Sequence, residues 1–157
     1  MDNLATYLND HLAGSTTGRE LAKRTLSNNR GTQFEPALEW LYGQIAEDRA
    51  ALLDIMRALG APEDHLKKLA AFTLERVGRL KPNNSLFSYS PLSRVVELEG
   101  LLIGVTGKLA GWRALQQLDD PRLAGFDLER LAQRALEQRE RIEEQRREAA
   151  RLAFEKS

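Results

Sequence analysis

The sequence predicts an all-α protein, a four-helix up-down bundle whose third helix is interrupted by a loop near residues 81–90. Apolar residues recur at intervals of three and four along most of the chain, as they do on one face of an α-helix. Clusters of Gly, Pro and Asn break this pattern at intervals of roughly one bundle height, and no stretch alternates as a strand would. The 157 residues, 42% of them hydrophobic, are expected to form one domain over 1–157.

The first helix is expected over about residues 3–28. Leu4, Leu8 and Leu12 share a face with Leu26, and the turn-rich sequence SNNRG at 27–31 ends the helix. The second helix follows at once. Thr32 and Glu35 have the spacing of a capping box, in which each side chain accepts a backbone N–H.

Gly60 and Pro62 end the second helix. Residues 64–80 then show helical spacing, and the sequence PNNS at 82–85 breaks it. Ser90 before Pro91 is typical of an N-cap followed by the first helical residue, so a long helix is expected to about residue 117.

Asp127 is expected to cap the last helix, which runs from Leu128 almost to the end of the chain. An extended coiled coil is the weaker alternative, because Trp and Phe residues along the chain need an interior to fill. The most apolar stretch, 95–112, contains Glu97, Glu99 and Lys108, which argue against a membrane span.

Composition excludes several functions. Lys plus Arg and Asp plus Glu both total 23, so no net charge favours nucleic acid, and the absence of Cys removes thiol chemistry and Cys-type metal sites. His11 and His65 stand alone, without a second His at metal-binding spacing. The first ten residues lack a basic region followed by an apolar run, so a cytoplasmic location is expected.

Gly100, Gly104, Gly107 and Gly111 recur at steps of four, three and four, and therefore lie on one helix face. Each costs about 1 kcal/mol in helix propensity relative to Ala, which indicates that something approaches this backbone closely. Tight packing against the small residues at 13–18, among them Ser15 and Thr16, is the favoured interpretation. A ligand pocket or a subunit interface between the two small-residue faces is the alternative.

The segments YLND at 7–10, WLYGQ at 40–44 and KLAGW at 108–112 resemble helices one, two and three of the ferritin-like superfamily, particularly bacterial stress-associated members of unknown function. The resemblance implies a ferritin-like bundle. Members with a di-iron site carry a Glu on two helices and a Glu-x-x-His motif, or a carboxylate equivalent, on the other two, all pointing inward.

At the positions that the resemblance implies for metal ligands, this chain has the neighbourhood of Ser15 on helix one and Val105 and Lys108 on helix three. The weak candidates that remain for a metal site are Glu47, Asp48 and Glu137, with Gln138 in phase with the core. Asp48 falls inside the apolar stripe of helix two, so we expect it to be buried and paired with an arginine, Arg24 or a residue beside Arg49. No metal, cofactor or catalytic residue is expected.

The sequence leaves two classes of function open. The first, which we favour, is a non-enzymatic helical module that dimerises or binds a protein partner or an apolar ligand. The apolar sequence at 149–154 supports docking of the C-terminal end on its own bundle or on a second subunit of a homodimer. The alternative is a metal-dependent oxidase or iron-binding protein that uses iron or manganese in a reduced carboxylate site.

Overall fold

A computed structural model describes residues 3–63 and 88–155. These residues form four long α-helices and a short 3-10 helix, η1, and contain no strand: α1 (Asn3–Asn28), α2 (Glu35–Leu59), α4 (Pro91–Leu115), η1 (Pro121–Leu123) and α5 (Leu128–Phe154). The prediction of an all-α protein with four long helices is confirmed. The helix expected at 64–80 and most of the loop expected at 81–90 lie outside the described residues.

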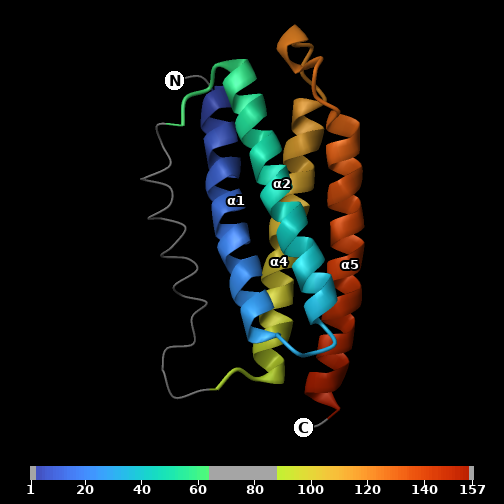
Figure 1. Cartoon of the computed structure of the whole chain (residues 1–157). Coiled ribbons are helices and arrows are strands. Elements are labelled where there is room, and N and C mark those ends of the chain that lie inside the picture. Colours follow the sequence, from blue (N-terminus) through green and yellow to red (C-terminus); the bar gives the residue numbers. More distant parts are fainter. Residues whose placement is uncertain (1–2, 64–87, 156–157) are drawn as a thin grey trace.

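The four helices are arranged as two antiparallel hairpins that pack side by side (Figure 1). One hairpin is α1 with α2, and the other is α4 with α5. The last turns of α2 and α4 lie at the same end of the bundle, where Arg122 Nη1 donates a hydrogen bond to the carbonyl oxygen of Leu59 at 2.9 Å. Because α2 and α4 run in the same direction, the helices do not alternate strictly up and down, and the end of α2 lies at the opposite end of the bundle from the start of α4.

A single hydrophobic core fills the space between the hairpins. Each helix contributes one apolar stripe, with fully buried residues such as Leu8 on α1, Ile55 on α2, Leu98 on α4 and Ile142 on α5. Small residues of α5, among them Ala135, are also fully buried, which lets α5 pack closely against α4. Burial of these stripes is the main source of stability for helices of this length.

The predicted helix ends agree with the local chemistry in most places. Gly60 adopts a left-handed conformation with φ of +68° and closes α2 through its N–H and that of Ala61. Ser90 caps α4 through a reciprocal pair of hydrogen bonds with Ser93, and Asp127 caps α5 by accepting the N–H of Arg130 at 2.8 Å. The expected start of α4 at Ser90-Pro91 is therefore confirmed.

The start of α2 differs from the prediction. Phe34 is the N-cap residue and makes no side-chain cap, while Glu35 Oε2 reaches back to the N–H of Gly31 at 2.7 Å. Thr32 Oγ1 accepts the N–H of Phe34 at 3.3 Å. The reciprocal Thr32–Glu35 capping box is not formed, because Gly31, with φ of +75°, turns the chain so that its own N–H faces the carboxylate.

The third bundle helix, α4, is continuous over 25 residues, so any interruption precedes it rather than dividing it. The C-terminal residues dock on their own bundle: Ala149 is in the core and Ala150 and Leu152 pack against it, whereas Phe154 is 61% exposed. Within the described ranges, no helix combines the length and the apolar character that a membrane span requires.

Candidate functional site

A cavity of about 330 Å³ opens between α1 and α4 and reaches inward to α2. Gly14 and Gly18 line it from α1, and Gly104 and Gly107 line it from α4. A Cβ atom placed on any of these four glycines would have no neighbouring atom within 4 Å. We call this opening the α1–α4 window; Ile45, Leu52, Leu101, Val105 and Trp112 supply much of its apolar lining.

The window is bounded by two places where α1 and α4 touch. A Cβ atom on Gly100 would lie 2.9 Å from Cδ2 of Leu21, and one on Gly111 would lie 2.8 Å from Cε1 of His11. Both distances are shorter than a real contact allows. The two glycines are eleven positions apart on α4, so the window is about 16 Å long at 1.5 Å per helical residue.

The glycine face therefore serves two purposes. Gly100 and Gly111 show the tight packing that we favoured for all four glycines, whereas Gly104 and Gly107 face open space.

The predicted small residues of α1 bond to their own helix. Ser15 lines the window and its hydroxyl donates to the carbonyl of Leu12 at 2.7 Å. Thr16 likewise donates to the carbonyl of Leu12, at 3.1 Å.

His11 covers one end of the window. Its ring stacks at a tilt on Tyr7, with 4.5 Å between the ring centroids, and rests against Gly111. Burial lowers the pKa of His11 below 6.5, against a smaller opposing effect of Asp10. The imidazole is consequently neutral at pH 7 and acts as an aromatic wall of the window.

A cluster of buried polar side chains forms the floor of the window. Asp48 is 1% exposed, and its Oδ2 accepts hydrogen bonds from Lys108 Nζ at 2.6 Å and from Gln138 Nε2 at 2.8 Å. Lys108 also donates to Oε1 of Gln138. Arg134 lies behind the cluster, 3.2 Å from Asp48 Oδ1. Three helices, α2, α4 and α5, thus meet at one carboxylate.

Two cationic groups of the window keep unused hydrogen-bonding capacity. An ammonium group has three donors, and the contacts of Lys108 with Asp48 and Gln138 use two of them. Arg49, which lines the window from α2, makes one long hydrogen bond to Thr16 Oγ1 at 3.4 Å. No carboxylate within the described ranges forms an ion pair with Arg49. Burial lowers the pKa of Lys108, and the neighbouring Asp48 opposes this effect.

The three candidate metal ligands do not converge. Asp48 is held by Lys108 and Arg134, Glu47 points outward to Arg134 Nη2 at 2.8 Å, and Glu137 is 43% exposed with Arg130 3.1 Å away. Within 3–63 and 88–155, no group of three or more His, Cys, Asp or Glu side chains is placed to hold a metal ion.

The expected burial and pairing of Asp48 is correct, but its partners differ from the prediction. Arg24 instead pairs with Glu97 at 2.9 Å, because its position on α1 brings it beside the first half of α4. Lys108 and Arg134 approach Asp48 from the other hairpin.

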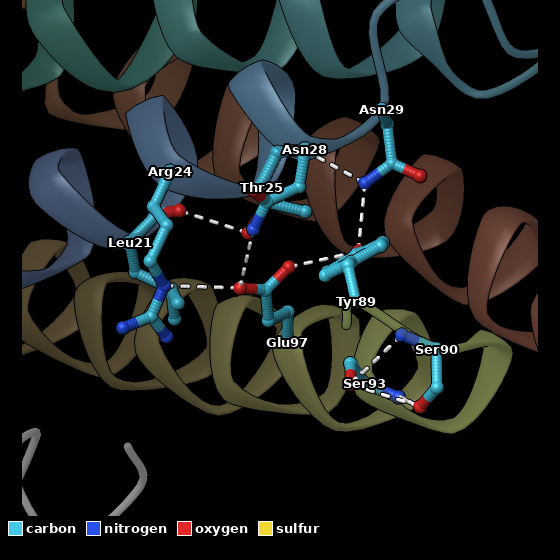
Figure 2. A network of polar contacts seen from close by, with 9 residues as sticks. All are labelled: Leu21, Arg24, Thr25, Asn28, Asn29, Tyr89, Ser90, Ser93 and Glu97. Carbon is cyan, nitrogen blue, oxygen red and sulfur yellow. Dashed lines mark hydrogen bonds and ion pairs between the residues drawn. The ribbon is translucent and has the colours of Figure 1, made fainter. Parts of the chain in front are cut away.

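A second polar cluster ties α1 to the start of α4 (Figure 2). Glu97, which is largely buried, accepts hydrogen bonds from Arg24, from Asn28 and from Tyr89 Oη at 2.9 Å. Asn29 in turn donates to Tyr89 Oη at 2.8 Å. This cluster was not predicted from the sequence, although the position of Glu97 inside the apolar stretch 95–98 was the available signal.

Burial and the neighbouring carboxylate of Glu97 determine the protonation state of Tyr89. Burial, more than the adjacent carboxylate, raises the pKa of the Tyr89 phenol to about 12, so it remains a donor over the physiological range. The guanidinium of Arg94 lies 4.5 Å from the ring centroid of Phe34 and closes the cluster. All of these polar groups have partners, so the cluster fixes the α1–α4 crossing rather than presenting a binding surface.

Comparison of the chain with protein-family models, with curated proteins and with solved structures finds no match.

Proposed function

We propose that this protein is a non-enzymatic, ferritin-like helical bundle that binds an apolar small molecule in the α1–α4 window. The observation that carries the proposal is the cavity of about 330 Å³ in that window. A cavity of this size lies within the range of small-molecule sites, which are mostly apolar with a few placed polar groups. The buried Asp48–Lys108 pair at its floor supplies such groups.

The chain path supports the ferritin-like part of the proposal. Two antiparallel helix hairpins joined by one long crossover between the second and third bundle helices are the arrangement of ferritin-like folds. In this chain α2 ends and α4 begins at opposite ends of the bundle, as such a connection requires (Figure 1).

The charges of the cluster favour a binding module over a metal-dependent oxidase. A metal ion on Asp48 would have to displace Lys108 from Oδ2 and would stand close to Arg134. Two cationic side chains against one buried carboxylate oppose a further divalent cation. In a ferritin-like bundle with a metal centre, a metal ion balances the charge of the inward-facing carboxylates. In this chain the ammonium of Lys108 balances the charge of Asp48.

Binding of the neutral fluorescent probe N-phenyl-1-naphthylamine tests the proposal. We expect one probe per chain in the wild type and at least tenfold weaker binding in the double variant G104L/G107L, because both new side chains start in the window. Gly43→Leu is the matched control, since Gly43 is an exposed helical glycine on α2 with open space around it and away from the window.

Retained binding in Gly43→Leu and loss in the double variant, with unchanged circular dichroism in both, would support the site. Absence of probe binding by the wild type, or equal affinity of the wild type and the double variant, would contradict it.

A further inference from the structure

We infer that the ligand of the α1–α4 window is an acidic amphiphile, a medium-chain carboxylic acid whose headgroup contacts Arg49 and Lys108. This inference rests on the proposed function and assigns the chemical class of its ligand. It follows from the balance of donors and acceptors in the window.

Cationic side chains and an amide of the protein surround the carboxylate at the floor of the window. Asp48 Oδ2 accepts hydrogen bonds from Lys108 and Gln138. Asp48 Oδ1 accepts no hydrogen bond from the described residues, but it is buried and lies 3.2 Å from the guanidinium of Arg134. A cationic headgroup at the floor would be repelled by Lys108 and Arg49, which both line the window. Asp10 also lines the window, but it is exposed on α1 beside His11.

The donors, by contrast, are not fully used. Lys108 has one N–H beyond its bonds to Asp48 and Gln138. Within the described residues, the half-buried Arg49 makes one side-chain hydrogen bond, to Thr16 at 3.4 Å. Both residues line the cavity. A carboxylate at this place would accept charge-assisted hydrogen bonds from two cations, the strongest type of hydrogen bond available in a protein.

The rest of the window suits a hydrocarbon chain. Lys108 lies near the His11–Gly111 end, and the window continues past Gly107 and Gly104 to Gly100. Eight helical residues from 108 to 100 correspond to about 12 Å. The glycine backbones and apolar side chains along this length are uncharged and can contact methylene groups of the ligand. We therefore place the acid headgroup near Lys108 and the alkyl chain toward Gly100.

Calorimetric titration of the full chain with decanoate, 1-decanol and decyltrimethylammonium at pH 7 tests the inference. The three ligands share an alkyl chain and differ in headgroup charge, and decanoate is ionised at this pH. We expect decanoate to bind at least tenfold more tightly than the other two, since about tenfold corresponds to one added charge-assisted contact.

Arg49→Gln should weaken decanoate binding about tenfold and leave 1-decanol binding unchanged. It removes a single long hydrogen bond, so the variant is expected to fold. Arg57→Gln is the matched control on the same helix, because Arg57 is exposed, lies outside the window lining and pairs with Asp54 on the surface. Lys108→Gln, checked for folding first, should weaken decanoate binding in the same way.

The outcomes separate the two proposals. Equal binding of decanoate and 1-decanol, preference for the cationic ligand, or equal losses in Arg49→Gln and Arg57→Gln would overturn the acid specificity while leaving an apolar site. Failure of all three ligands and of the neutral probe to bind would overturn the proposed function itself.

Discussion

At the scale of single residues, Asp48 links the two hairpins in the interior of the bundle. It is 1% exposed and its charge is balanced by Lys108 and Arg134 from the other hairpin. A buried carboxylate is costly to desolvate, so its partners must be in place when the hairpins pack. The cluster therefore favours one axial alignment of α2 against α4 and α5.

We expect Asp48→Asn to lower the free energy of unfolding by about 3 kcal/mol, because it leaves two buried cations without their carboxylate. Urea unfolding measures this value. Asp54→Asn, on the same helix, removes an exposed pair with Arg57 and should change stability by less than about 0.5 kcal/mol. Similar losses in the two variants would contradict the importance of the buried cluster.

The sequence predicted part of this site. Helical phase alone placed Asp48 inside the stripe of α2 and Gln138 in phase with the core, and both are buried. The partners were not predictable from phase, because Lys108 and Arg134 are brought to Asp48 by the rotation and offset of whole helices. Arg24 has a similar phase on α1 but meets Glu97 instead.

At the scale of elements, the glycines of α4 determine both the contact and the separation between α1 and α4. Leu21 and His11 fill the space over Gly100 and Gly111, whereas nothing fills the space over Gly104 and Gly107. Spacing in the sequence showed that the four glycines share a face. It did not show which ones touch a neighbour, because that depends on the residue opposite each one on α1.

Gly104→Ala and Gly111→Ala should change stability in opposite directions. At Gly104 the added methyl group meets no atom, so the gain in helix propensity of about 1 kcal/mol should raise Tm by about 2–4 °C. At Gly111 the same propensity gain is outweighed, because the methyl group would overlap the His11 ring at 2.8 Å and overpacking costs about 1–3 kcal/mol, which leaves a net loss of about 1 kcal/mol. Calorimetry of both variants checks this difference; a Tm for Gly111→Ala equal to that of Gly104→Ala would contradict it.

Helix ends were the most predictable elements, because they depend on neighbouring residues. Ser90 with Pro91 and Gly60 gave the limits of α4 and α2 correctly. The start of α2 was less predictable, since the turn at Gly31 lets Glu35 bond to a different N–H than a capping box requires.

At the scale of the whole molecule, the two hairpins contact each other through α1 with α4 and through α2 with α5, on either side of the α1–α4 window. α1 packs on α4, α2 packs on α5, and η1 contacts α2. The residues that flank the crossover are bonded to α1 on both sides: Asn9 Nδ2 donates to the carbonyl of Pro62 at 3.0 Å, and Asn29 donates to Tyr89 Oη. Composition and periodicity predicted four helices, but the direction of each helix depends on this crossover, which local patterns do not specify.

This arrangement makes the protein a natural candidate for fragment complementation. Each hairpin keeps its own internal turn, and the interface between the hairpins contains the buried Asp48 and Glu97 clusters as well as the core. A protease site inserted after residue 74 would divide the chain between the hairpins without cutting either one.

We expect the two cleaved fragments to elute together in size-exclusion chromatography and to unfold cooperatively, with a Tm that rises with fragment concentration because association has become bimolecular. Asp48→Asn should weaken reassociation of the fragments more than Asp54→Asn does. Separate elution of the fragments under native conditions would show that the covalent crossover, rather than the interface, holds the hairpins together.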